Sequence, residues 1–138
     1  MPLDFIRVLL DTGMLILIWL VQLVIYPGFC YYSETDLILW HKKYTTRLSY
    51  IVMPLMIGQL LVTAVQLLNV VTVYTLVSGF VVIALWLSTF IQFVPLHNSI
   101  ATKTAAKETP QRLVKLNWIR TVLWTFLFIW SIFWYSHV

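Results

Sequence analysis

Charged side chains are scarce in this chain: they make up 10% of its 138 residues, whereas hydrophobic residues make up 61%. Soluble domains typically carry about 25% charged and about 45–50% apolar residues. The composition therefore argues against a soluble globular domain and also against a disordered chain. Because the chain has a single cysteine, a scaffold held together by disulfide bonds is excluded as well.

Long stretches lack any Asp, Glu, Lys or Arg. One covers residues 12–33, a second covers the 55 residues of 48–102, and after Thr121 only His137 could carry charge. A helix that crosses a membrane needs about 20 predominantly apolar residues, so the second stretch holds two spans with a tight turn near Asn69. We predict one domain, residues 1–138, with four spans at 5–26, 48–68, 73–94 and 116–134.

The predicted spans should be α-helices. Only helices and closed barrels satisfy every backbone hydrogen bond in lipid, and a barrel needs segments of about ten residues that alternate in polarity. The uninterrupted apolar run from Met14 to Leu20 does not alternate. The predicted fold class is therefore all-α, an integral membrane four-helix bundle.

The distribution of basic residues predicts the orientation. With four spans, both termini lie on one side, where Arg7 is the only basic residue. The opposite side has eight: Lys42, Lys43, Arg47, Lys103, Lys107, Arg112, Lys115 and Arg120. By the positive-inside rule, segments 27–47 and 95–115 are cytoplasmic and both termini face outward, as in a protein of the bacterial inner (plasma) membrane. The positive net charge of the chain then indicates contact with anionic lipid headgroups, and no nucleic acid is expected as a partner.

Local signals set the expected helix ends in the two cytoplasmic segments. The Pro27-Gly28 pair should end the first helix. Either Ser33 or Thr35 should cap a new helix that leads into the second span. In the second segment, the Thr109-Pro110 pair is typical of an N-cap followed by the first helical residue.

Polar side chains gather at the cytoplasmic boundary of all four spans. Helical spacing of i, i+3 and i+7 puts them on shared faces with aromatic residues. These faces are Trp19 with Gln22 and Tyr26, His41 with Tyr44 and Leu48, Phe90 with Phe93 and His97, and Asn117 with Arg120 and Trp124. If the faces turn inward, the bundle encloses an aromatic-walled pocket with two imidazoles, a guanidinium and an amide at its mouth.

Each of these polar residues also has a purely structural interpretation. The Arg120 side chain can snorkel to phosphate headgroups. His41, next to two lysines, can be a solvated interfacial residue, and His97 can cap the third helix. Gln59 and Gln66, which lie seven residues apart, are predicted to bind helices together. Asp4, Arg7 and Asp11 fall on one helix face, where they can pair with one another as a capping network.

The residue types limit the chemistry. Two histidines can bind a transition metal or both faces of a haem iron, but few carboxylates lie nearby to complete a closed metal site. Without a metal, a histidine can act as general base while Arg120 and Asn117 hold an oxyanion. The cofactor is therefore left open between haem, a transition metal and none. The candidate catalytic residues are His97, Asn117, Arg120 and His41; the candidate substrate-binding residues are Gln22, Tyr26, Tyr44, Phe93 and Trp124; the candidate metal ligands are His41 and His97.

Two groups of residues carry a family resemblance over residues 19–124. The first is Gln22 to Tyr26-Pro27, His41 with Tyr44, and Pro54-Leu55-Met56; the second is Pro95-Leu96-His97, Arg112-Leu113-Val114, Asn117-Trp118-Ile119-Arg120-Thr121 and Trp124. Together they resemble the anthrone-oxygenase-like family of four-helix membrane proteins, a group mostly of unknown function. The resemblance implies a four-helix bundle that oxidises polycyclic aromatic compounds with oxygen, with His97, Asn117 and Arg120 as the site. The protoporphyrinogen-oxidase-like haem proteins match less well, because they carry a histidine in the first span.

Two functions follow as expectations. The first is a membrane-embedded oxidoreductase or oxygenase acting on an apolar aromatic or quinone-like compound that enters from the lipid. The second is a non-enzymatic module that binds lipid or an apolar small molecule, or a small subunit of a larger membrane complex. Expected partners are membrane lipids, an apolar small molecule, and either further copies of the chain or a larger membrane complex.

Overall fold

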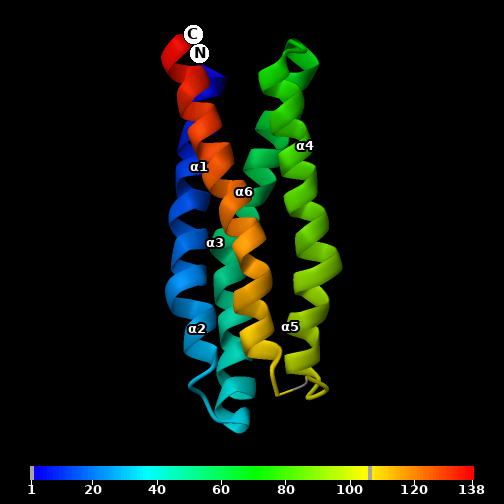
Figure 1. Cartoon of the computed structure of the whole chain (residues 1–138). Coiled ribbons are helices and arrows are strands. Elements are labelled where there is room, and N and C mark those ends of the chain that lie inside the picture. The colour runs from blue at the N-terminus through cyan, green and yellow to red at the C-terminus, as the bar shows by residue number, and fades with distance from the viewer. Residues whose placement is uncertain (1, 106) are drawn as a thin grey trace.

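The computed structural model describes residues 2–105 and 107–138, and within them every regular element is helical. The elements form four long helical segments that run up and down (Figure 1). The first consists of α1 (Pro2–Leu20), η1 (Val21–Ile25) and α2 (Tyr26–Phe29), and the second is α3 (Glu34–Asn69). The third consists of α4 (Val73–Ser88), η2 (Thr89–Phe93) and α5 (Val94–Ala101), and the fourth is α6 (Thr109–His137).

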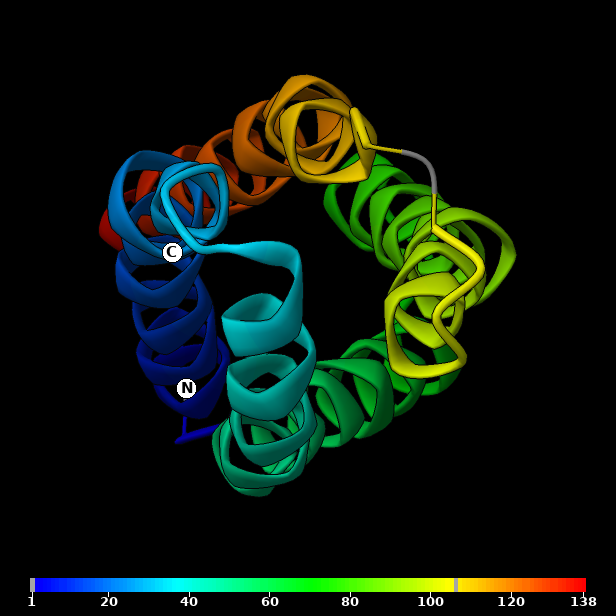
Figure 2. The ribbon, with the colours of Figure 1, turned by 90° about the horizontal axis from the view of Figure 1, so that it is seen from below.

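The four segments form a square bundle. Helices α1 and α4 each pack against both α3 and α6. Helix α1 therefore lies diagonally opposite α4, and α3 lies diagonally opposite α6 (Figure 2). Both termini and the short turn between α3 and α4 lie at one end of the bundle (Figure 1). The connections from α2 to α3 and from α5 to α6 lie at the other, which we call the loop end.

All four segments are long and apolar enough to cross a membrane, which confirms the predicted all-helical class with four candidate spans. The helices extend beyond the predicted spans. At 1.5 Å per residue, the 36 residues of α3 reach about 54 Å, whereas the hydrocarbon core is about 30 Å thick. Most of segments 27–47 and 95–115 is therefore helical, and the non-helical connections at the loop end are short.

Side-chain caps begin two of the helices. Ser33 precedes α3 and its hydroxyl accepts the backbone N–H of Asp36 at 3.2 Å, so Ser33 rather than Thr35 is the cap. Thr72 and Thr75 form a reciprocal capping box that starts α4 directly after the turn near Asn69. Because these caps satisfy N–H groups that the first turn leaves free, they fix where the helices begin.

Two expected helix ends were wrong. The first helix does not stop at Pro27-Gly28 but continues to Phe29, and Thr109 is the first residue of α6 instead of its N-cap. The first difference has a physical cause. Proline lacks an N–H, and its ring clashes with the carbonyl four residues earlier, which usually breaks a helix. A wider π-helical turn lies immediately before this proline, and another lies before Pro95. In these turns the backbone N–H bonds to the carbonyl five residues earlier, from Tyr26 to Val21 and from Val94 to Thr89.

The π-helical turns also change which side chains face inward. Each turn adds a residue relative to the α-helical repeat, so a face inferred from i, i+7 spacing does not continue through it. Trp19 and Phe90 were expected to share inward faces with the site, but they are 36% and 51% exposed. Tyr26 and Phe93, which lie at the ends of the two turns, are buried. The turns thus set the rotation of the two site-bearing segments.

A buried ionic network ties α1 to α3 and α6 in the half of the bundle near the termini. Arg7 and Asp11 are fully buried, and Arg7 Nε lies 2.8 Å from Asp11 Oδ2. The predicted pairing within α1 is confirmed, but the network is larger than a cap. Its interhelical hydrogen bonds run from Arg7 to Thr63 and Gln66, from Gln59 and Ser131 to Asp11, and from Gln66 to Asp4. The prediction that Gln59 and Gln66 bind helices together is also confirmed.

Candidate functional site

A chain of three hydrogen-bonded side chains crosses the bundle toward the loop end. The hydroxyl of Tyr26 lies 3.0 Å from Nε2 of His97. Nδ1 of His97 lies 2.6 Å from Nε2 of His41. The three residues come from α2, α5 and α3, so the contact joins three of the four helical segments. We call Tyr26, His97 and His41 the relay.

The relay has two complete hydrogen-bonding arrangements. A neutral imidazole donates with one nitrogen and accepts with the other. If Tyr26 donates to His97, then His97 must donate to His41, and Nδ1 of His41 carries the last proton. In the second arrangement His41 donates to His97 and His97 donates to the Tyr26 oxygen. Nδ1 of His41 then carries no proton, and the Tyr26 hydroxyl hydrogen points away from His97. Passing one proton along the relay converts the first arrangement into the second.

Arg120 lies next to the relay without an acidic partner. Its guanidinium carbon is 4.1 Å from the ring centroid of Phe93 and 5.1 Å from that of Trp124, and its Nε has no hydrogen-bond partner. Its guanidinium is hydrogen-bonded to the Tyr26 side chain and interacts electrostatically with Tyr44. Among the described residues, no carboxylate forms a salt bridge with it. Aromatic faces attract a cation, but more weakly than a carboxylate does in a dry site.

The two buried arginines therefore differ in kind. Arg7 is neutralised by Asp11 in the same helix, which is the expected solution for a charge buried among apolar helices. Arg120 is only 7% exposed, yet it keeps an unneutralised charge among aromatic rings. Burial of an unpaired charge is strongly unfavourable, so a residue that keeps one points to a functional requirement. An anionic ligand would supply the missing partner.

An apolar cavity of about 160 Å³ adjoins both the relay and Arg120. Its partly exposed lining residues lie on α3, where they include Ser49 and Met53, and on η2 and α5, where they are Thr89, Val94 and His97. The cavity therefore opens between these two helical segments, on the outer surface of the bundle. A cavity of about 150 Å³ holds one benzene ring, so this one accommodates an aromatic ring whose remaining rings extend toward the opening.

The structure brings most of the predicted site residues together. The cavity is lined by Tyr26, Tyr44, Phe93, His97, Arg120 and Trp124. His41 lies behind His97. Gln22 and Asn117 are not among the described residues that line the cavity. The amide of Asn117 donates to the Gln22 side chain at 3.0 Å, the Thr121 hydroxyl donates to it at 2.9 Å, and Gln22 donates to the Val114 carbonyl. This contact holds the first segment to α6, which is a structural role.

The histidine pair does not have the geometry of a metal site. The facing nitrogens are 2.6 Å apart and share a hydrogen bond, whereas each would lie about 2.0–2.1 Å from a common metal with its lone pair directed at that metal. The two rings also lie 4.8 Å apart and almost stacked, which leaves no room for a haem between them. Among the described residues, no group of three or more His, Cys, Asp or Glu could hold a metal ion.

Several contributors to the site were missed from the sequence. Gln59 accepts the indole N–H of Trp124 at 3.1 Å and also donates to Asp11, so it connects the cavity wall to the ionic network. Met14 and Ile18 of α1 line the cavity as well. An apolar residue facing a cavity has the same sequence pattern as one facing the core, so among these missed residues only the polar Gln59 carried a usable signal in the sequence.

No family model, curated protein or solved structure matches the chain. The class of the protein is therefore defined by its fold alone. It is an all-helical protein with four helices long and apolar enough to cross a membrane.

Proposed function

We propose that the protein is a membrane-embedded oxidoreductase that removes a proton from a phenolic or enolisable aromatic compound in the apolar cavity. Dioxygen then oxidises the resulting anion. The bundle would lie in a bacterial inner membrane, with both termini outside and the loop end in the cytoplasm. This proposal extends the resemblance to the anthrone-oxygenase-like proteins and needs no metal or haem.

The observation that carries the proposal is the position of the unpaired Arg120 cation at the cavity, beside the Tyr26 end of the relay. Removing a proton from an apolar substrate creates an anion in a dry site. A guanidinium that is already in place stabilises that anion without reorganisation, which is the largest single contribution in many enzymes. The relay supplies the other requirement, a path that takes the proton away.

The reaction balances without a further reductant. A methylene group between two aromatic rings becomes a carbonyl, which removes four electrons from its carbon. Dioxygen gains these four electrons; one oxygen atom remains as the carbonyl and the other leaves as water with both hydrogens. The relay would carry a proton away from the substrate when the anion forms. It would return a proton to the departing oxygen, which restores its first hydrogen-bonding arrangement.

The test uses anthrone as probe, with the protein in lipid nanodiscs. We expect one dioxygen consumed per anthraquinone formed, and a loss of turnover of about 10²–10⁴-fold in His97→Asn and Tyr26→Phe, because general acid–base groups contribute on that order. The matched control is His137→Asn, which removes an exposed histidine at the opposite end of α6 and should leave turnover unchanged. Binding of anthrone by the wild type without oxygen consumption would support the non-enzymatic binding module instead.

The proposed orientation has its own test. Cys30 is the only cysteine of the chain, and it is exposed at the loop end. A membrane-impermeant maleimide should label it in inside-out vesicles and leave it unlabelled in intact spheroplasts. The opposite pattern would contradict a cytoplasmic loop end. Cys30→Ser gives the background for both measurements.

A further inference from the structure

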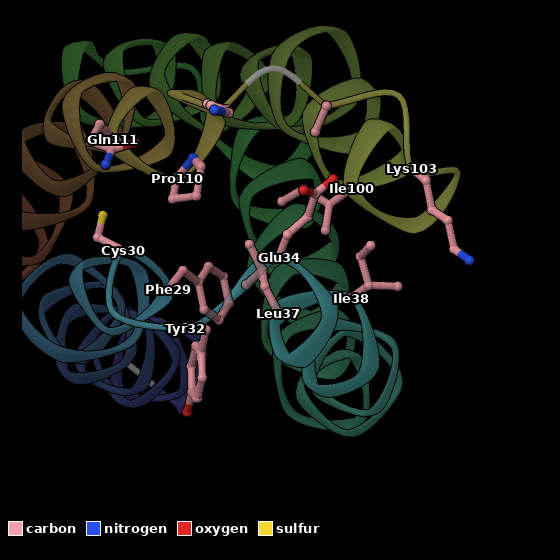
Figure 3. A pocket seen from close by; sticks show the side chains of 12 residues that line it. Phe29, Cys30, Tyr32, Glu34, Leu37, Ile38, Ile100, Lys103, Pro110 and Gln111 are labelled. Atoms are coloured by element: carbon pink, nitrogen blue, oxygen red, sulfur yellow. The ribbon is translucent and has the colours of Figure 1, made fainter.

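A second cavity, of about 310 Å³, lies at the loop end (Figure 3). It is formed where α2 ends, α3 begins, α5 ends and α6 begins. In contrast to the apolar cavity, it is lined partly by charged and polar side chains, namely Glu34, Lys103, Lys107 and Gln111. In Figure 3 the Glu34 side chain extends over Leu37 toward Ile100, whereas the Lys103 side chain points away from the cavity. Glu34 is thus the acidic group directed into it.

A thin apolar layer separates this loop-end cavity from the relay. Leu37 lies one turn before His41 on α3, and Ile100 lies one turn after His97 on α5; both are buried and line the cavity. Phe29 also lines it, and its ring packs edge-on against His41 with the centroids 5.8 Å apart. One helical turn corresponds to about 5.4 Å, so a single layer of side chains separates the cavity from the relay.

The relay ends at His41 with a free atom. Nδ1 of His41 is buried and has no hydrogen-bond partner, although His41 is only 1% exposed. Unsatisfied buried polar atoms are rare and call for an explanation such as catalysis or an unseen water molecule. Glu34, Leu37 and His41 fall at i, i+3 and i+7 of α3, which places them on one face of the helix. His41 with its free nitrogen, Leu37 of the apolar layer and the Glu34 carboxylate therefore follow one another along this face of α3.

We propose that the loop-end cavity is the water-filled port through which the relay exchanges protons, with Glu34 as the group that takes up and returns them. Phe29, Leu37 and Ile100 form the layer that water must cross to reach His41. This inference rests on the proposed function, because it gives the proton removed from the substrate a destination. The proton passes from Nδ1 of His41 to water and then to the Glu34 carboxylate, and it returns by the same route, so charge and atoms balance.

The port also accounts for the two unlike cavities. The aromatic compound and dioxygen, both apolar, reach the relay from the lipid side, while protons reach it from the loop end. Because the relay lies between the two cavities, the substrate anion next to Arg120 is shielded from bulk water. Exclusion of water strengthens the attraction between that anion and the guanidinium.

The experiment measures proton exchange at His41 and does not depend on turnover. The chain has only three histidines, so a protein labelled with ¹⁵N-histidine gives a simple imidazole spectrum. Water exchange at His41 is measured by saturation transfer in detergent micelles, with His137 as the exposed reference. A bulky maleimide on Cys30, which lines the loop-end cavity, should slow the exchange at His41 about tenfold, whereas a small methylthio adduct should not.

Two variants test the layer and the carboxylate. Phe29→Ala should speed exchange at His41 about tenfold, while Leu127→Ala, an equally buried site outside both cavities, should not change it. Glu34→Gln should slow exchange, and added formate should restore it, a rescue that a merely structural role would not show. If neither the Cys30 adduct nor Glu34→Gln changes the rate of proton exchange at His41, the proposed port is wrong. The Cys30 adduct is made on the folded wild-type protein. Its effect on exchange therefore tests the port even if a variant misfolds.

The two proposals can fail separately. Normal control of exchange by Cys30 and Glu34 without oxidation of anthrone would leave the port standing and remove the oxidoreductase. Oxidation of anthrone, together with exchange that does not respond to changes in the loop-end cavity, would support the oxidoreductase and rule out the port.

Discussion

Replacement of Asp11 by leucine is expected to destabilise the bundle by about 3–5 kcal/mol, because it leaves the Arg7 charge buried without a partner. Asp11 is fully buried and accepts hydrogen bonds from Arg7, Gln59 and Ser131. The change removes the one carboxylate on which all three donors converge. The measurement is the free energy of unfolding in mixed micelles, followed by far-UV circular dichroism.

The control is the double variant Arg7→Met with Asp11→Leu. Replacing both members of a buried ion pair with apolar residues is often neutral, so the double variant should recover most of the loss. Incomplete recovery is expected from Gln59 and Ser131, which keep polar groups that had bonded to Asp11. A double variant as unstable as Asp11→Leu alone would show that the ionic network stabilises the bundle through more than charge neutralisation.

The number and type of helices follow from the sequence because the bilayer imposes a severe constraint. Four apolar stretches without Asp, Glu, Lys or Arg in their centres leave few other structures. Caps such as Ser33 were predictable for a similar reason, since the first turn of a helix needs side-chain acceptors for its free N–H groups. The rule that proline ends a helix gave the wrong end at Pro27. A π-helical turn before this proline lets the helix continue through it, and the sequence gives no signal for such a turn.

The candidate site was predictable only where helical phase is undisturbed. In α3 and α6, which contain no π-helical turn, the faces of His41 with Tyr44 and of Arg120 with Trp124 are buried as expected. Gln22 and Asn117 do not line the cavity as expected, because the Asn117 amide donates to the Gln22 side chain and joins η1 to α6. Spacing identifies the face of a helix, but it does not identify which polar groups on that face bond to each other.

Replacement of Arg120 by methionine is expected to have opposite effects on stability and on function. It removes a buried charge that has no carboxylate partner, so the variant should unfold at higher temperature than the wild type. It also removes the cation proposed to hold the substrate anion, and loss of one such group typically lowers turnover by about 10²–10³-fold. The readouts are thermal unfolding and the fraction of a bound hydroxyanthraquinone dye present as phenolate, measured from its visible absorption.

Arg7→Met is the matched comparison, because it makes the same change at the other fully or nearly buried arginine. It should destabilise the protein by leaving Asp11 unpaired, and it should leave the ionisation of the bound dye unchanged. Arg120→Lys keeps the charge but loses the guanidinium that lies over the Phe93 ring, so we expect partial retention of the phenolate. A destabilised Arg120→Met protein that still binds the phenolate would assign Arg120 the same structural role as Arg7 and remove the main support for the oxidoreductase.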